Sequence, residues 1–362
     1  MDTLNFKDTQ ALVTAAIKAR TPIYVEGPPG VGKTAMASAI ARELGRPLDV
    51  LILSQCDPTD VGGFPVVQPS GVVARYPLGA IKRACDRASV LFLDEATCAP
   101  PAVQATALRG VNEREFGDCQ LHPDTAIILA GNPVDQAAGG AELSLPMLNR
   151  ITKIKIQPDL REIQDYLYNL GDEGSTLRSE AVSYAATLEN APDLLAINPP
   201  AGAQSAGRPW ASPRSIERSM RLCAQLLDDG VGRDSKLYAA ALAGNLGEDT
   251  AGAFLSIYRL RANLPSIKEV KADPTAARLP GDLQTGIAVL GILAQVAQSD
   301  APAAWVYADR LADGEIKVAS FRILVRLPFE AKGAAPSKWR AQAAKARVRV
   351  MGQMGTALRG DE

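Results

Sequence analysis

Residues 26–38, EGPPGVGKTAMAS, combine glycines, a lysine and a threonine at a spacing that suits the binding of phosphate groups. Gly27, Gly32, Lys33 and Thr34 fit the pattern G-x-x-x-x-G-K-[ST]. In this pattern, backbone N–H groups of the loop surround the phosphates of a nucleotide, and the positive end of the next helix points at them. We expect Lys33 to reach the β- and γ-phosphates of ATP and Thr34 to hold Mg²⁺. The other loop residues expected to bind the nucleotide are Pro28, Pro29, Gly30 and Val31.

Two acidic residues follow an apolar stretch, VLFLDEA (90–96), that predicts a buried strand. Asp94 would lie near the Mg²⁺ ion, and Glu95 can accept a proton from an attacking water or orient it. A helix start that merely attracts acids would explain one carboxylate, but not a strand that leads directly into two. The pair therefore predicts hydrolysis, and it argues against a small-molecule kinase, which needs no residue to activate water.

Three more polar residues stand at the ends of predicted elements. The strand AIILAGNP (126–133) ends at Asn132, which can position the water, although a strand-ending Asn-Pro turn explains it equally well. Arg150 follows a short helix at the edge of the core, and Arg214 lies in the first turn of a helix that Ser212 can cap. An arginine at the position of Arg214 can swing toward a γ-phosphate. For each one alone, the alternative is a solvated surface ion pair.

Short apolar strands alternate with helices in the first part of the chain, which predicts an α/β fold with a parallel, doubly wound sheet. The expected strands are 22–27, 48–54, 89–96, 125–133 and 152–157. The expected helices are 8–20, 34–45, 80–88 and 100–115. Residues 57–79 are rich in glycine, proline and β-forming residues and predict a hairpin-like insertion.

After Pro158 the pattern is almost wholly helical, apart from a Pro/Gly/Ala loop at 198–213. We therefore expect three parts. These are a nucleotide-binding α/β core over 1–157, a helical lid over 158–230, and a helical C-terminal extension with a basic tail over 231–362.

Composition excludes several classes of site. The formal net charge of the 362 residues is −1, so no global field attracts nucleic acid or a membrane. His122, read as a turn residue, is the only histidine, which argues against a His-based zinc site or a Ser-His-Asp triad. Five cysteines without a C-x-x-C pair suggest free thiols in a reducing cytosol. With no signal sequence and no apolar stretch of membrane-spanning length expected, the protein should be cytoplasmic.

The order of these motifs resembles that of the AAA+ ATPases: glycine loop, acid pair, strand-ending Asn, LNR, and SPR in a helical lid. Details resemble the MoxR branch. The stretch DPTDVGG…GVVARYPLG resembles its helix-2 insertion, and LDEATCAPPAVQATALRGVNERE resembles its hallmark stretch after the acid pair. Residues 244–274 resemble its helical C-terminal part. LPMLNRI keeps the arginine of the family's LDRF, although its neighbours differ.

The resemblance implies a P-loop AAA+ core and a role for each site residue. Lys33 and Thr34 become phosphate and Mg²⁺ ligands, Asp94 the Mg²⁺ partner and Glu95 the catalytic base. Asn132 becomes sensor 1. The implied arginine roles are a finger inserted into a neighbour's site for Arg150 and sensor 2 for Arg214.

The resemblance also implies an assembly and a partner. The chain is expected to form a ring, a hexamer, that hydrolyses ATP to remodel another protein. That protein can carry a von Willebrand factor A domain. One rival is a nucleic-acid motor, which nucleic-acid-stimulated ATPase activity would favour. Its support is a basic tail between 331 and 360, where a solvated face is the alternative. The other rival is a non-hydrolysing structural ring, which a turnover assay tests. The basic residues of the tail are Lys332, Lys338, Arg340, Lys345, Arg347, Arg349 and Arg359.

Overall fold

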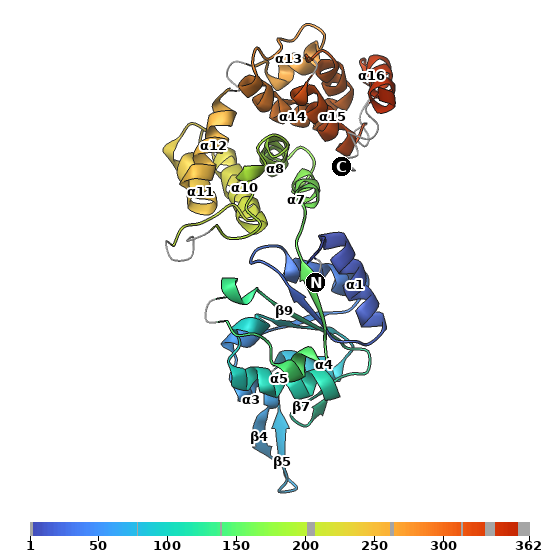
Figure 1. Cartoon of the computed structure of the whole chain (residues 1–362), viewed down its shortest axis with the longest axis vertical. Coiled ribbons are helices and arrows are strands. Elements are labelled where there is room, and N and C mark those ends of the chain that lie inside the picture. The colour runs from blue at the N-terminus through green and yellow to red at the C-terminus, as the bar shows by residue number, and fades with distance from the viewer. Residues whose placement is uncertain are drawn as a thin grey trace. The chain divides into compact units, whose positions relative to one another are not determined.

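The computed structural model describes residues 3–77, 79–137, 140–200, 207–260, 264–312, 314–329 and 337–353. The chain divides into two compact units. The first, here called the sheet unit, comprises Met1–Asp159 with Ile197–Pro199, and the second, the helical unit, comprises Leu160–Ala196 and Pro200–Glu362. Figure 1 shows a sheet flanked by helices in the first unit and helices in the second. The expected separation of a lid from an extension at residue 230 stays a prediction.

The sheet unit is built on six strands, and every neighbouring pair of them is parallel. In spatial order they are β1 (Thr3–Leu4), β10 (Thr152–Ile156), β2 (Ile23–Glu26), β9 (Ala126–Gly131), β6 (Val90–Asp94) and β3 (Leu48–Ile52). β2 lies inside this order, with β9, β6 and β3 on one side of it and β10 on the other, and helices cover both faces, so the sheet is doubly wound, as the sequence predicts. The short β1 is an addition that the sequence reasoning did not include.

Buried side chains form an apolar core on each face of this sheet. Along β9, Ile128 and Ala130 belong to the core on one face of the sheet, whereas Ile127 and Leu129 belong to the core on the other face. The helices are α1 (Phe6–Lys18) and α2 (Lys33–Glu43) for the first core, and α4 (Gly79–Asp86) and α5 (Pro101–Glu113) for the second. Strands buried on both faces explain why they read as continuous apolar runs in the sequence.

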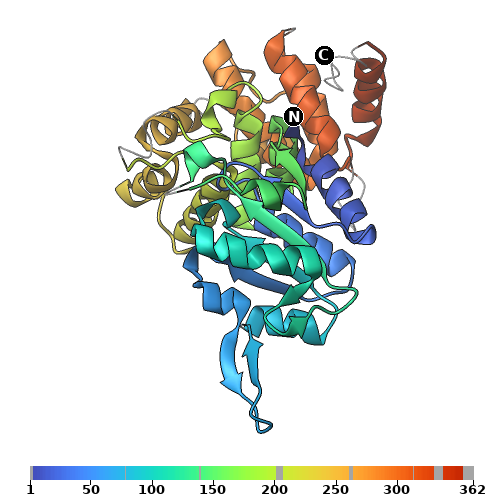
Figure 2. The same ribbon diagram turned by 60° about the horizontal axis from the view of Figure 1, so that its bottom comes forward.

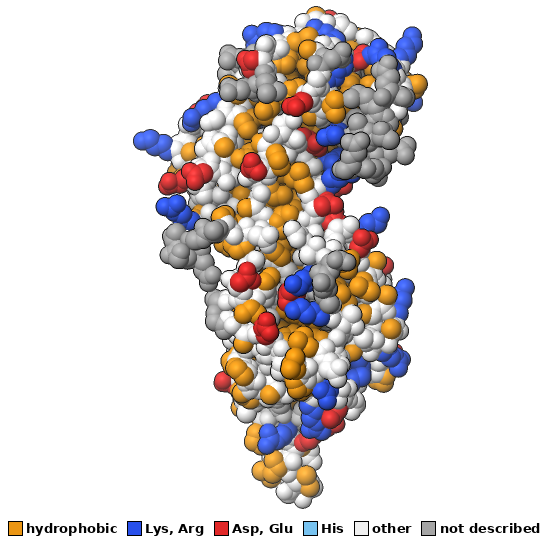
Figure 3. Space-filling view, in the orientation of Figure 1, with side chains coloured by type: hydrophobic (Ala, Val, Ile, Leu, Met, Phe, Trp, Pro, Cys, Tyr) orange, Lys and Arg blue, Asp and Glu red, His pale blue; other side chains and the backbone are white. Residues whose placement is uncertain are grey.

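The insertion predicted over 57–79 contains a short helix followed by an antiparallel hairpin. Figure 2 shows the hairpin projecting from the rest of the unit. Its elements are α3 (Pro58–Gly62), β4 (Phe64–Val67) and β5 (Val73–Tyr76). Hydrophobic side chains gather on it, at the lower end of Figure 3, and the most exposed is Val67, at 71%. The prediction of a hairpin-like insertion is confirmed.

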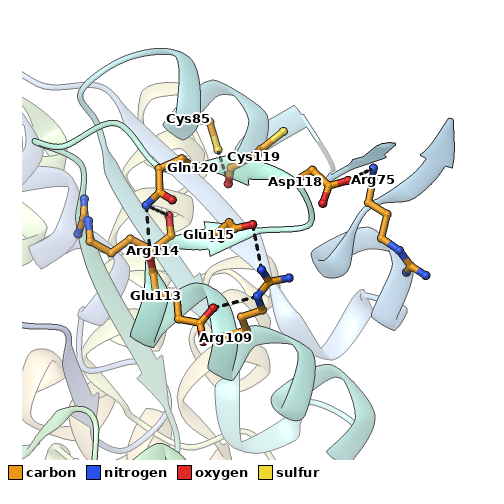
Figure 4. A network of polar contacts seen from close by, with 9 residues as sticks. All are labelled: Arg75, Cys85, Arg109, Glu113, Arg114, Glu115, Asp118, Cys119 and Gln120. Carbon is orange, nitrogen blue, oxygen red and sulfur yellow. Dashed lines mark hydrogen bonds and ion pairs between the residues drawn. The ribbon is translucent and has the colours of Figure 1, made fainter. Parts of the chain in front are cut away.

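A second, smaller hairpin, which the sequence reasoning did not predict, lies against the base of the first (Figure 4). Its strands are β7 (Glu115–Phe116) and β8 (Cys119–Gln120). The Asp118 carboxylate accepts a hydrogen bond from the Arg75 backbone N–H at 2.7 Å, and the Asp118 N–H donates to the Arg75 carbonyl at 3.0 Å. Arg109 of α5 forms an ion pair with Glu115 at 2.9 Å. The two hairpins and α5 are thus joined by polar contacts.

Two minor expectations from composition are met. All five cysteines are free. His122 lies beside a turn, where its carbonyl accepts a hydrogen bond from the Thr125 N–H at 2.9 Å.

The helical unit is organised around one long helix, α14, which packs against α8, α12, α13, α15 and α16. The α-helices described in this unit are α7 (Leu160–Tyr168), α8 (Thr176–Thr187), α10 (Pro213–Asp228), α11 (Lys236–Leu246), α12 (Glu248–Arg259), α13 (Ile267–Ala272), α14 (Leu283–Asp309), α15 (Glu315–Arg326) and α16 (Arg340–Gln353).

The expectation that no apolar stretch reaches membrane-spanning length was wrong for α14. Residues Thr285–Asp309 are long and apolar enough by length and composition, although most of this stretch is buried inside the protein. The backbone also leaves helical geometry at Asp300, with φ −152° and ψ 71°, just before Pro302. The helix is apolar because other helices surround it in this unit.

Candidate nucleotide-binding site

Four neighbouring strands end in polar or glycine-rich residues at the same edge of the sheet. Gly27, Glu95 and Asn132 are the residues directly after β2, β6 and β9. Ser54 lies just beyond the end of β3. Because all four strands are parallel, their carboxyl ends meet at one edge, which is where open α/β sheets bind ligands.

The loop after β2 has the backbone that a phosphate cradle requires. Gly30 and Gly32 have φ angles of 86° and 96°, in the left-handed region that favours glycine. Gly27 is needed for a different reason, because a Cβ added to it would lie 2.4 Å from Cγ2 of Ile156. Loops with such alternating backbone angles direct successive N–H groups toward one point and bind anions.

The helix that follows this loop is suited to receive a negative charge. α2 begins at Lys33, its N-cap is Gly32, and the cap offers no side-chain hydrogen bond. No acidic residue lies in its first turn. The first N–H groups of a helix lack partners within the helix and carry its positive end, so a phosphate group fits the start of α2.

The ammonium group of Lys33 connects the loop to the end of β9. It donates hydrogen bonds to the Gly27 carbonyl at 2.6 Å, the Pro28 carbonyl at 3.0 Å and the Asn132 side-chain oxygen at 2.8 Å. All three acceptors are neutral oxygens. The side chain is 8% exposed, and a partly buried charge acts on a phosphate more strongly than one in open water.

Thr34 and Asp94 form the second connection across the site. The Thr34 hydroxyl donates to one carboxylate oxygen of Asp94 at 3.2 Å, and the Glu95 N–H donates to the other at 2.9 Å. A hydroxyl and a carboxylate are oxygen ligands that suit Mg²⁺. Across the described ranges of the chain, no group of three or more His, Cys, Asp or Glu side chains gathers to bind a metal. Thr34 and Asp94 would hold Mg²⁺ together with nucleotide phosphates, and Mg²⁺ would supply charge neutralisation there.

Glu95 has an unusual backbone and a partner that the sequence reasoning missed. Its φ of 56° and ψ of 36° place it in the left-handed region, where a non-glycine residue is uncommon. Its side chain is exposed, and its carboxylate accepts a hydrogen bond from the Ser54 hydroxyl. Burial, followed by the negative charge of Glu95, raises the pKa of the Cys98 thiol. The position of Ser54 as the polar residue that ends the apolar run 48–54 was the signal that would have found it.

Arg150 lies away from these residues. It follows α6 (Leu145–Leu148), is exposed, and donates to the Pro146 carbonyl at 2.9 Å. The next strand, β10, begins at Thr152, which is in register with Ile23, the first residue of β2. Arg150 therefore lies at the amino edge of the sheet, about 10 Å or more along β2 from the phosphate loop at a rise of ~3.3 Å per residue.

Arg214 belongs to the helical unit. It is exposed in the first turn of α10, where Pro213 is the first helical residue and the Ser212 side chain accepts from the Ser215 N–H at 3.2 Å. The cap and the proline position follow the sequence prediction. The role of Arg214 as sensor 2 stays a prediction.

Of the basic tail, Lys332 and Arg359 lie outside the described residues. Within the described part, Lys338 donates to the Ala272 carbonyl at 3.1 Å and Arg349 forms an ion pair with Asp309. Arg347 lies over the ring of Phe329, 5.1 Å from its centroid. These side chains have partners within the helical unit, and binding of nucleic acid by the tail stays a prediction.

Residues 22–151 match a family model described as an AAA domain of the dynein-related subfamily. The chain is 29% identical to midasin of Giardia intestinalis over 226 residues, which is 59% of this chain and 4% of that protein. It is 32% identical to midasin of Dictyostelium discoideum over 164 residues, 40% of this chain and 3% of that protein. The chain thus spans only a small part of the curated relatives it matches.

Among solved structures, the chain is similar to the RuvB Holliday junction branch migration motor of Thermotoga maritima, with 18% identity, a TM-score of 0.39 and coverage of 70% and 69% of the two chains. It is also similar to NtrX of Brucella abortus, with 17% identity, a TM-score of 0.41 and coverage of 72% and 61%. By sequence, residues 22–151 of the sheet unit are thus similar to AAA domains.

Proposed function

We propose that this chain binds ATP with Mg²⁺ and hydrolyses it to ADP and phosphate. The observation that supports this best is the set of hydrogen bonds that joins Lys33 to Asn132 and Thr34 to Asp94 at one edge of the sheet. Glu95 adjoins the same edge with an exposed carboxylate. Cation, Mg²⁺ ligands, base and polar sensor are thus within one small region, as hydrolysis of a nucleoside triphosphate requires.

The proposed reaction assigns one task to each side chain. Lys33 and the loop N–H groups bind the β- and γ-phosphates. Asn132 orients a water molecule, and Glu95 accepts its proton as the water oxygen bonds to the γ-phosphorus. The bond from that phosphorus to the β–γ bridging oxygen breaks, which leaves ADP and phosphate.

The direct test is phosphate release by the purified chain with ATP and Mg²⁺, measured for the wild type, Lys33→Ala and the control Lys18→Ala. Lys18 is an exposed lysine in the last turn of α1, away from the loop. We expect Lys33→Ala to lose nucleotide binding and turnover, because it removes the charge that meets the phosphates. Lys18→Ala should retain both. Binding of ATP by Lys33→Ala with unchanged affinity would contradict the proposed site.

We further propose that the active form is a ring, a hexamer of the MoxR type, in which Arg150 completes the site of the next subunit. Arg150 is exposed at the amino edge of the sheet, where its own phosphate loop is out of reach. The proposed task of this cytoplasmic ring is to remodel a protein partner that carries a von Willebrand factor A domain. The sequence likeness to the MoxR branch and to midasin supports this.

The partner is tested by affinity purification from native extract with Glu95→Gln protein and ATP, since this variant should bind ATP without hydrolysing it. Lys33→Ala protein is the control. Recovery of a protein with a von Willebrand factor A domain on the first but not the second would support the partner class. Equal recovery on both would contradict an ATP-dependent interaction.

A further inference from the structure

Thr97 lies two residues after Glu95 and contacts both ends of the segment that follows β9. Its side-chain hydroxyl donates to the Asn132 carbonyl at 2.9 Å. Its own carbonyl accepts from the Ala141 N–H at 2.8 Å. Thr97 is 2% exposed, so these bonds are shielded from water, where competition would weaken them.

The end of β9 leaves just enough room for this hydroxyl. A Cβ added to Gly131 would lie 2.7 Å from Oγ1 of Thr97 and 2.7 Å from the hydroxyl oxygen of Tyr24. Real Cβ atoms do not approach other atoms so closely, and Tyr24 is fully buried. Glycine at position 131 therefore allows the close approach between the turn after the acid pair and the end of β9.

The turn that carries Thr97 is itself fixed to α5. The Gln104 side-chain amide, 5% exposed, donates to the carbonyls of Ala96 and Ala99, both at 3.2 Å. These two carbonyls flank Thr97 in the chain. The hydroxyl is thus presented from a braced turn to the Asn132 backbone, and it is not a group that rotates freely at the surface.

We infer that Thr97 is a positioning residue for hydrolysis, which fixes the separation between Glu95 and Asn132. Glu95 is two residues from Thr97 along the chain, and the Asn132 side chain is bonded to Lys33. Loss of the hydroxyl frees the Asn132 backbone to shift while the lysine contact and the nucleotide-binding loop remain. This inference rests on the proposed hydrolysis, because loss of the Thr97 hydroxyl should slow the step in which a water is held between Glu95 and Asn132.

The test compares three substitutions. Thr97→Val has nearly the same shape without the hydroxyl, and Thr97→Ser keeps the hydroxyl. The control is Thr106→Val, since the Thr106 hydroxyl donates to the Ala102 carbonyl of its own helix at 2.8 Å. We expect Thr97→Val to lower kcat by about 10- to 100-fold with KM for ATP within about twofold, because small displacements of reacting groups cost that much. Thr97→Ser and Thr106→Val should resemble the wild type.

Hydrogen exchange of residues 132–137 gives a readout that does not require turnover. These amides should exchange faster in the Thr97→Val variant than in the Thr97→Ser variant. Thermal unfolding of both variants is measured as the control for overall stability. Gly131→Ala should reproduce the kinetic effect, and Thr97→Val combined with Gly131→Ala should lose little more than either alone, because both break one contact.

Several outcomes would overturn the inference. These are a kcat for Thr97→Val within twofold of wild type, an equal loss in Thr97→Ser, or unchanged exchange of 132–137. Failure of the wild type to hydrolyse ATP would instead overturn the proposed function. Faster exchange in Thr97→Val would then still support the structural hold on Asn132, and unchanged exchange would remove that as well.

Discussion

The two edges of the central sheet differ in what they hold. At the carboxyl edge, Lys33, Thr34, Asp94 and Asn132 are joined by side-chain hydrogen bonds. At the amino edge, Arg150 is exposed and donates only to the nearby Pro146 carbonyl among the contacts described for it. The carboxyl edge has the parts of a binding site, whereas at the amino edge the Arg150 guanidinium is exposed.

This difference suggests that one chain supplies the residues that bind the nucleotide, whereas Arg150 serves the site of another copy of the chain. Strand direction fixes which residues of one chain can meet, and it brings every expected phosphate and Mg²⁺ ligand to the same edge. The same geometry keeps Arg150 from its own loop. A guanidinium placed this way is useful for hydrolysis only if another copy of the chain brings its carboxyl edge to it, which is the basis of the proposed ring.

The largest expected effect concerns the amino edge. Arg150→Ala should bind ATP nearly normally and hydrolyse it 10³- to 10⁵-fold more slowly, which is about the range found when an arginine finger supplied in trans is removed. Arg20→Ala is the matched control, because Arg20 is also exposed just before β2 and pairs only with Asp124 in the described contacts, at 3.0 Å. Steady-state phosphate release at saturating ATP measures both.

A mixing experiment shows whether Arg150 acts in its own subunit. Arg150→Ala and Glu95→Gln proteins should each be nearly inactive, and their mixture should recover part of the activity at interfaces that pair an intact Glu95 with an intact Arg150. Absence of recovery, with subunit exchange confirmed, would contradict the shared site, and Arg150 would then either act in its own subunit or be a surface charge.

The next largest effect is expected at Glu95. Glu95→Gln should keep ATP affinity and lower turnover by about 10²- to 10⁴-fold, because the amide can hydrogen-bond a water but cannot take its proton. Equilibrium binding of a fluorescent ATP analogue and single-turnover hydrolysis separate the two quantities. Turnover within a few-fold of wild type would show that Glu95 is not the base.

A smaller effect should follow from loss of a metal ligand. Thr34→Ala should raise the Mg²⁺ concentration needed for half-maximal turnover, whereas Thr34→Ser, which keeps the hydroxyl beside Asp94, should need about as much as the wild type. A Mg²⁺ titration of ATPase activity measures this, and EDTA should abolish activity in all three. An unchanged Mg²⁺ requirement in Thr34→Ala would argue against Thr34 as a ligand.

The strands and the glycine loop could be predicted because their signals are local. The apolar run before Asp94 and the pattern around Gly27 require only neighbouring residues, and β6 and the loop lie where they were expected. The small hairpin at 115–120 could not be predicted in this way. Its strands have two residues each, and it is held by contacts with Arg75, 43 positions away from Asp118.

Two site residues escaped prediction for a related reason. Ser54 and Thr97 carry ordinary hydroxyls. The position of Ser54 after an apolar strand is a weak signal, and nothing in the immediate sequence of Thr97 distinguishes it from a surface residue. Their importance comes from the strands and turns that bring them to Glu95 and Asn132. The apolar stretch Thr285–Asp309 of α14 was also missed, and its burial inside the protein accounts for its apolar composition.

The smallest expected effect is at Ser54, and it tests how precisely the carboxyl edge must be ordered. The Ser54 hydroxyl donates to the Glu95 carboxylate, and among the described hydrogen bonds no other reaches that carboxylate. Ser54→Ala should lower kcat by about fivefold, the effect of losing about 1 kcal/mol from one hydrogen bond. KM for ATP should not change, because Ser54 touches no phosphate-binding residue in the described contacts. Ser54→Thr, which keeps a hydroxyl, should lose less. If Ser54→Ala lowers kcat as much as Glu95→Gln does, the hydroxyl takes part in the reaction itself, and if kcat rises, it restrains Glu95 instead of aligning it.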